Sequence, residues 1–139
     1  MDILLENVFL EVNLSNNEIN EYSPLVLAYV GDAVFELFIR TKIVLQKKLS
    51  VHNLHLNSVQ YVKAKAQCEI IKKIKPLLLN EELDIVRRGR NTKTGSVPKN
   101  TDISEYRYAT GFEALIGFLY LKKDFKRLKE ILEMCIQNN

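Results

Sequence analysis

The sequence has few of the residues that build disulfide-rich, fibrous or membrane-spanning proteins. Its 139 residues include two cysteines, three prolines, five glycines and no tryptophan. Cys68 and Cys135 are far apart and form no CxxC pair, which excludes a disulfide framework and favours free thiols in a reducing cytoplasm. Charged residues interrupt every apolar run before it reaches transmembrane length. The N-terminal residues MDILLE carry acids and no basic residue, so we expect no signal peptide and no membrane partner.

The remaining composition is typical of one helical domain. Apolar residues make up 47% and charged residues 27%, the balance of a globular protein. Apolar residues recur at helical spacing, which predicts an all-α fold with residues 1–139 as a single domain. Ser23 followed by Pro24 is a typical helix start, and Pro76 a typical stop. The predicted helices cover residues 24–46, 51–75, 81–88, 104–122 and 124–137, with a short helix before residue 13 and a loop over 91–100.

Positive charge is concentrated in the middle of the chain, although the formal net charge is only +3. From residue 60 to residue 107, eleven Lys or Arg stand against six Asp or Glu, an excess of five. Such an excess suits a polyanion, and it suits a solvated face equally well. The densest part is residues 87–100, RRGRNTKTGSVPKN. Arginine forks and backbone N–H groups bind phosphate oxygens, so here we favour nucleic acid over a solvated loop.

Two acids stand out because they interrupt apolar helical runs: Asp32 in LAYVGDAVFE and Glu113 in ATGFEALIGFLYL. An ionised carboxylate in such surroundings is costly unless a cation or hydrogen bonds compensate it. Gly31 adjoins the first acid, and Gly111 and Gly117 flank the second. Glycine inside a helix costs about 1 kcal/mol relative to alanine, which close packing of two helices would offset. If the two helices pack at these glycines, the two carboxylates would meet.

A facing pair of carboxylates calls for a cation. Magnesium commonly takes one or two carboxylates and completes its shell with water and substrate phosphate. The alternative is that each acid pairs separately with an Arg or Lys, and the residues alone favour neither. His52 and His55 lie three residues apart, but no second pair of ligands nearby would complete a zinc site.

The segments around Asp32 and Glu113 together resemble the two signature segments of the ribonuclease III catalytic domain, an endoribonuclease that cleaves double-stranded RNA. Between them RRGRN, PKNTD and YRYATGFEAL follow in the order typical of the short bacterial form, Mini-ribonuclease III, which has no separate RNA-binding domain. The resemblance covers residues 25–121. It implies an all-α homodimer that uses magnesium to hydrolyse phosphodiesters in the precursor of the large-subunit (23S) ribosomal RNA.

The resemblance also assigns residues. Asp32 matches the family's signature aspartate and Glu113 its essential glutamate, which implies that both are catalytic and bind magnesium. Where the longer ribonuclease III enzymes have two further acids, this chain has Ala28 and Thr110, each one helical turn from a retained acid. The number of metal ions therefore stays open. The basic segment would bind RNA through Arg87, Arg88, Arg90, Asn91, Lys93 and Lys99.

Three functions agree with these features of the sequence. The first is an endoribonuclease acting on structured, double-stranded RNA. The second is a helical RNA-binding or ribosome-associated module that kept the fold and lost activity, which the two missing acids favour. The third is a metal-free helical DNA-binding protein. The sequence leaves open whether a ribosomal protein takes part.

Overall fold

The computed structural model describes residues 13–93 and 96–136, and within these ranges all regular structure is helical. The predicted all-α fold is confirmed. In chain order the elements are α1 (Asn16–Asn20), α2 (Pro24–Gln46), α3 (Val51–Val62), α4 (Ala64–Ile74), the 3-10 turn η2 (Lys75–Leu77), α5 (Asn80–Asn91), α6 (Ile103–Leu121) and α7 (Phe125–Ile136). No helix in the described part of the chain is both long and apolar enough to cross a membrane.

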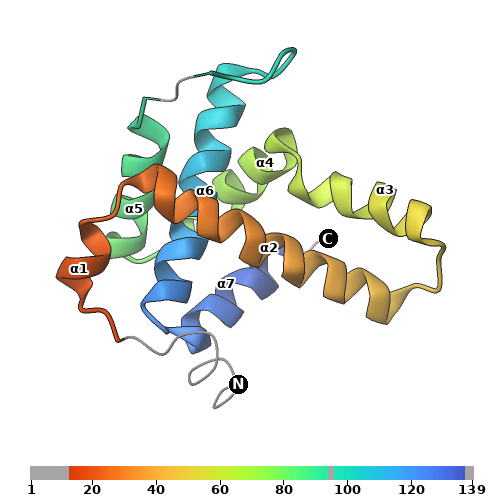
Figure 1. The fold of residues 1–139 in the computed structure, drawn as a ribbon, viewed down its shortest axis with the longest axis horizontal. Helices are drawn as coiled ribbons and strands as arrows, with labels where there is room; N and C mark the ends of the chain where they lie inside the picture. Colours follow the sequence, from red (N-terminus) through yellow and green to blue (C-terminus); the bar gives the residue numbers. More distant parts are fainter. Residues whose placement is uncertain (1–12, 94–95, 137–139) are drawn as a thin grey trace.

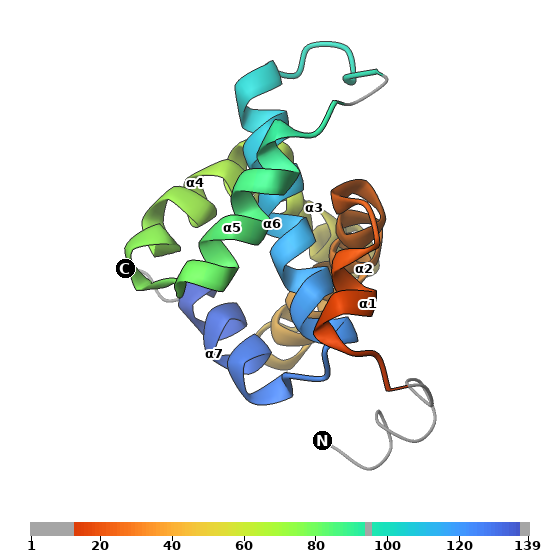
Figure 2. The same ribbon diagram turned by 90° about the vertical axis from the view of Figure 1, so that its left-hand side faces the viewer.

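Helix α6 forms the centre of the fold. It packs against α2, α4, α5 and α7, and these four helices surround it in two perpendicular views (Figures 1 and 2). Most residues of its second half are buried, among them Phe112, Leu115 and Phe118, none of which is exposed. Because a helix enclosed in this way needs apolar residues on all sides, the near-continuous apolar run of the sequence around residue 113 is explained by its central place.

Helices α2 and α6 approach each other backbone to backbone. A Cβ atom added to Gly31 would lie 1.7 Å from the carbonyl oxygen of Glu113, and one added to Gly117 would lie 1.9 Å from that of Leu27. No other residue fits at either position, which explains why the glycine cost within each helix is tolerated. Further along the same contact the rings of Phe35 and Phe112 pack edge to face, with centroids 4.9 Å apart.

The predicted start of α2 is confirmed, and its bounds agree with the predicted 24–46. The hydroxyl of Ser23 accepts a hydrogen bond from the backbone N–H of Val26, and Pro24 occupies the first helical position. The prediction of one continuous helix over 51–75 is wrong, because two helices occupy this range. The chain breaks at Lys63, whose ψ of 154° is extended, and this break lets α4 turn back against α6 (Figure 1).

The other helices begin near their predicted residues. Asp102 caps α6 by accepting a hydrogen bond from the N–H of Glu105. At the start of α5 the side chain of Glu82 accepts the Leu79 N–H, at 2.8 Å. Helix α5 continues to Asn91, three residues beyond its predicted end. The short helix predicted before residue 13 and the predicted last residue of α7, at 137, lie outside the described residues.

A buried ion pair joins the start of α5 to α7. Glu82 is 2% exposed, and each of its carboxylate oxygens accepts a hydrogen bond of 2.8 Å from the guanidinium of Arg127. The same guanidinium donates to the carbonyl oxygen of Leu77. This acid is thus fully compensated by protein groups, which keep its pKa below the ordinary value.

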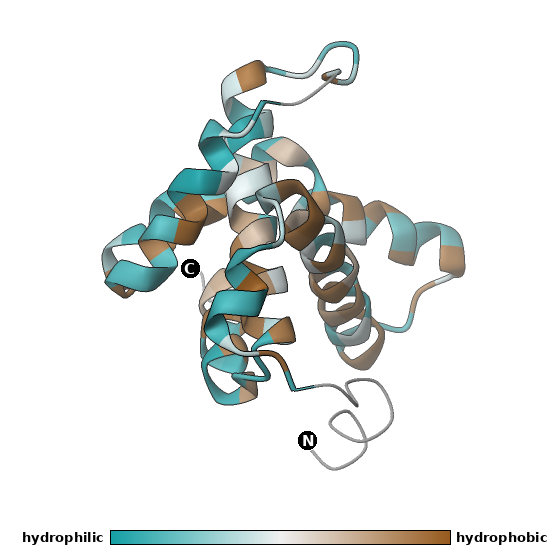
Figure 3. Ribbon diagram, turned by 60° about the vertical axis from the view of Figure 1, so that its left-hand side comes forward, coloured by the Kyte–Doolittle hydropathy of each residue, from teal (hydrophilic) through white to brown (hydrophobic). Residues whose placement is uncertain are grey.

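The outer side of α2 is apolar and exposed. Most residues of this helix are apolar (Figure 3), and Tyr29 and Leu37 are 82% and 68% exposed. Together with α7 they line an open groove of about 710 Å³ that also includes Phe125 and Leu128. An apolar surface of this size on one helix is typical of a protein interface.

Candidate active site

The close contact of α2 and α6 brings the two predicted acids together. Gly31 precedes Asp32 on α2, and its Cα faces the backbone of Glu113 on α6. The carboxyl groups of Asp32 and Glu113 are close enough to interact electrostatically. The expectation that the glycine-rich segments pack together and that their carboxyl groups meet is therefore confirmed.

The expectation that Asp32 is enclosed by its apolar neighbours is wrong. Asp32 is exposed and lies at the edge of the apolar groove between α2 and α7. Glu113 is the enclosed member of the pair, only partly reachable by solvent. The reason is that several apolar residues around Asp32 in the sequence, such as Tyr29 and Leu37, point outward and do not cover it.

Burial and the neighbouring carboxyl group raise the pKa of Glu113 from 4.5 to about 9. Burial is the larger cause, because it disfavours the charged form, and the interaction with Asp32 adds to it. Without a cation Glu113 therefore keeps its proton at neutral pH. A carboxyl group with a pKa perturbed this strongly and facing a second acid is a typical sign of a functional site.

One neutral donor acts on Glu113 in the opposite direction. The side-chain nitrogen Nε2 of Gln67, on α4, donates a hydrogen bond of 3.2 Å to Oε2 of Glu113, which lowers the pKa of that carboxyl. Gln67 is 1% exposed. Both residues line a pocket of about 190 Å³ between the α3–α4 junction and α6, together with Tyr106 and Thr110. Gln67 is not predicted from the sequence, since nothing in its local pattern sets it apart from a surface residue.

Ala28 and Thr110, the positions at which longer family members carry acids, both lie close to the pair. Ala28 is buried on α2, one turn before Asp32. Thr110 lines the same pocket as Glu113, and its hydroxyl donates to the carbonyl oxygen of Tyr106 in its own helix. The local acid set is therefore small. In the described part of the chain no group of three or more His, Cys, Asp or Glu side chains is placed to hold a metal ion.

The donor set still fits one hard divalent cation. Asp32 and Glu113 provide carboxylate oxygens from two helices, and the pocket beside Glu113 has space for water-sized ligands. Magnesium is commonly held by one or two carboxylates, with water and substrate phosphate in its other positions. Neither acid has an Arg or Lys in the described ion pairs, in contrast to Glu82. A cation between Asp32 and Glu113 would compensate the charge that no described basic residue compensates.

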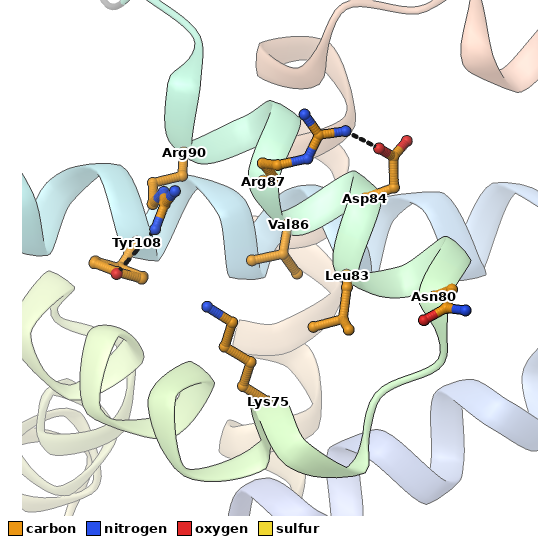
Figure 4. A pocket seen from close by; sticks show the side chains of 8 residues that line it. All are labelled: Lys75, Asn80, Leu83, Asp84, Val86, Arg87, Arg90 and Tyr108. Carbon is orange, nitrogen blue, oxygen red and sulfur yellow. Dashed lines mark hydrogen bonds and ion pairs between the residues drawn. The ribbon is translucent and has the colours of Figure 1, made fainter.

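The structure distributes the predicted RNA-binding residues over two sides of α5. Arg87 and Arg90 line a pocket of about 280 Å³ with Lys75 (Figure 4). Arg87 forms an ion pair with Asp84, and Arg90 donates to the hydroxyl of Tyr108, at 3.0 Å. The Nζ atom of Lys72 also lies over the Tyr108 ring, 4.7 Å from its centre. Two cations, Lys72 and Arg90, thus lie over one aromatic ring.

The remaining predicted RNA-binding residues lie elsewhere. Arg88 points toward α1, where its guanidinium lies 3.5 Å from the side-chain and backbone oxygens of Asn20. Asn91 ends α5, while Lys93 and Lys99 are exposed in the connection that leads to α6. The six residues therefore form no single described patch, although all of them lie on α5 or on the α5–α6 connection.

Residues 25–124 match the ribonuclease III domain, and the chain belongs to the ribonuclease III family of endoribonucleases. Its relatives include bacterial proteins named Mini-ribonuclease 3. It is 56% identical over 133 residues to Mini-ribonuclease 3 of Thermoanaerobacter sp. (strain X514), covering 96% of this chain and 92% of that one.

Two further comparisons agree. The chain is 43% identical to Mini-ribonuclease 3 of Staphylococcus aureus over 126 residues, which cover 89% of this chain and 94% of the relative. A crystal structure of a protein from Fusobacterium nucleatum superposes with a TM-score of 0.75 at 40% identity, covering 85% of this chain and 94% of that one. The resemblance expected from the sequence is thus confirmed for both the family and the fold.

Proposed function

We propose that the chain is a magnesium-dependent endoribonuclease that cleaves double-stranded RNA at a site formed by Asp32 and Glu113. The observation that carries this proposal is the carboxyl pair itself. Two acids from separate helices meet without a described basic partner, and one of them has its pKa raised to about 9. Such an arrangement is unfavourable for the protein alone and becomes favourable when a divalent cation binds.

Each member of the pair has a separate part in this proposal. Asp32 is exposed, so it provides the ligand that substrate and water reach first. Glu113, in its deprotonated form, would provide the second ligand from the enclosed side. Magnesium would supply the positioning of water, the polarisation of the scissile phosphate and the stabilisation of developing negative charge.

The basic residues suit recognition of an A-form RNA duplex through its backbone better than recognition of individual bases. Double-stranded RNA is recognised mainly through its shape, phosphates and 2′-hydroxyl groups. The cations on α5 and on the α5–α6 connection can bind phosphates. We assign Arg87, Arg88, Arg90, Asn91, Lys93 and Lys99 to this contact.

A second copy of the chain is the occupant that we propose for the apolar groove between α2 and α7. The groove contains exposed aromatic and aliphatic residues, and Asp32 lies at its edge. A two-fold dimer across this face would bring two sites to one duplex, one for each strand. Leu37→Asp should give a monomer in light scattering, whereas Val51→Asp, at a more exposed apolar residue outside the groove, should leave the dimer intact. A dimeric Leu37→Asp protein would exclude this interface.

The enzymatic proposal is tested by incubating the purified protein with duplex RNA and with duplex DNA, each with magnesium and with chelator. Magnesium-dependent cleavage of RNA alone is the expected result. Binding of RNA without cleavage would instead support a non-catalytic RNA-binding module, the reading that Ala28 and Thr110 favour. Preference for DNA without any metal requirement would support a DNA-binding protein.

The natural substrate that we propose is the precursor of the large-subunit (23S) ribosomal RNA, in the cytoplasm. The two cysteines are free and buried, which agrees with a reducing compartment. Mapping 23S RNA ends in cells with and without this protein should show extended ends in its absence. Restoring the wild-type chain, but not Asp32→Asn, should restore the mature ends. Normal ends in cells that lack the protein would direct the search to other structured RNAs.

A further inference from the structure

Gln67 is a buried polar residue whose side chain is directed at the proposed active site. It is 1% exposed on α4, and its Nε2 lies 3.2 Å from Oε2 of Glu113. A buried amide is costly unless it is hydrogen-bonded, so its presence calls for an explanation. The break at Lys63 explains how it reaches the site, because it turns the first residues of α4 against α6.

The chemistry of an amide suits this position better than that of a charged residue. An Arg or Lys would neutralise Glu113, as Arg127 neutralises Glu82. It would therefore compete with a divalent cation for this carboxylate. An apolar residue would leave one carboxylate oxygen buried without a donor. The neutral N–H of Gln67 occupies one oxygen of Glu113, fixes the orientation of its carboxyl group and leaves the charge available to a cation.

We infer that Gln67 is a positioning residue, which holds the Glu113 carboxylate in the orientation that binds the divalent cation. This inference rests on the proposed function. It goes beyond it by assigning to α4 a residue that acts through Glu113 and touches neither substrate nor cation. Groups that orient metal ligands typically change metal affinity or activity by about 10–100-fold when removed.

The test uses Gln67→Met, which keeps length and volume but removes the donor, with Gln60→Met as the matched control on an exposed glutamine of α3. Magnesium binding is measured by calorimetry, and cleavage is measured at saturating RNA over a range of magnesium concentrations. We expect the half-saturating magnesium concentration to rise about 10–100-fold in Gln67→Met. Excess magnesium should restore kcat, and the KM for RNA should stay unchanged. Gln60→Met should match wild type in all of these measurements.

A purely structural role for Gln67 would lower the melting temperature without changing the magnesium requirement, and that outcome would overturn the inference. Gln67→Asn keeps a buried amide but shortens its reach by one methylene, and it should show the same magnesium defect. Nuclear magnetic resonance of the wild-type protein tests the same role without any substitution that could disturb folding. The side-chain amide resonance of Gln67 should shift on magnesium addition while that of Gln60 does not. An unchanged Gln67 resonance at saturating magnesium would equally exclude the role.

Failure of the inference and failure of the proposed function give different results. If Glu113→Gln cleaves RNA like wild type, the proposed site itself is wrong. If Glu113→Gln is inactive while Gln67→Met keeps the wild-type magnesium requirement, the site is right and Gln67 does not position it.

Discussion

Replacing Glu113 by glutamine should stabilise the metal-free protein, which is the opposite of what removal of a buried structural acid does. Glutamine has the shape of the protonated acid and still offers Oε1 to the Gln67 amide. The folded protein raises the pKa of Glu113 from 4.5 to about 9, so the folded state binds this proton more tightly than the unfolded state. Its contribution to stability is therefore complete below pH 4.5 and is lost progressively as pH rises toward 9.

The size of the effect follows from the same shift. Each pH unit above 4.5 costs wild type about 1.4 kcal/mol of unfolding free energy, which amounts to roughly 3 kcal/mol at pH 7. Glu113→Gln lacks this titration, so the two proteins should be equally stable near pH 4 and differ by roughly 3 kcal/mol at pH 7. Urea unfolding in chelator, at equal protein concentration across this pH range, measures the difference. Glu69→Gln, at an exposed glutamate of α4, controls for the loss of one negative charge.

Magnesium should largely remove this difference. At a hundred times its dissociation constant it stabilises wild type by about 2.7 kcal/mol and should leave Glu113→Gln unchanged. Because the cation displaces a proton, its affinity for wild type should rise about tenfold per pH unit below pH 9. A Glu113→Gln protein that is 3–5 kcal/mol less stable than wild type in chelator would refute this reasoning, since that loss is typical of a broken buried ion pair.

Three further perturbations test other parts of the structure. Asp32→Asn should abolish cleavage while RNA binding and the fold persist, as seen in gel shift and circular dichroism; retained cleavage would remove Asp32 from the site. Replacing Lys93 and Lys99 together by alanine should weaken RNA binding across sequences and reduce the slope of its salt dependence by about one unit per lost contact; an unchanged slope would make the segment a solvated surface. Gly117→Ala should prevent the close packing of α2 and α6 and unfold or strongly destabilise the protein, because the added Cβ would lie 1.9 Å from a backbone oxygen; a normal melt would show that the contact is looser.

The fold and the carboxyl pair could be predicted from the sequence because both leave local signals. Ser23 and Pro24 mark the start of α2, and Gly31 and Gly117 mark the close contact of two helices that each carry one acid. These signals depend on residue type at neighbouring positions, which the sequence displays directly. The pairing of Asp32 with Glu113 then followed from packing alone.

The errors have equally physical causes. The break at Lys63 involves no proline or glycine, and it depends on the packing of α4 against α6. The burial of Asp32 was overestimated because apolar neighbours in sequence also occupy the outward side of α2. Gln67 could not be found because its partner lies 46 residues away, and a buried glutamine looks like an exposed one until the tertiary contact is known.

The backbone contact between Gly31 and Gly117 has a consequence for folding. The two glycines are far apart in the chain, so closing this contact carries a large loop-closure cost and depends on the intervening helices being in place. The same contact is what brings the two acids together. A chain in which α2 has not yet docked would therefore carry both acids without the proposed active site. With that site, nuclease activity would be available only to molecules that have completed folding.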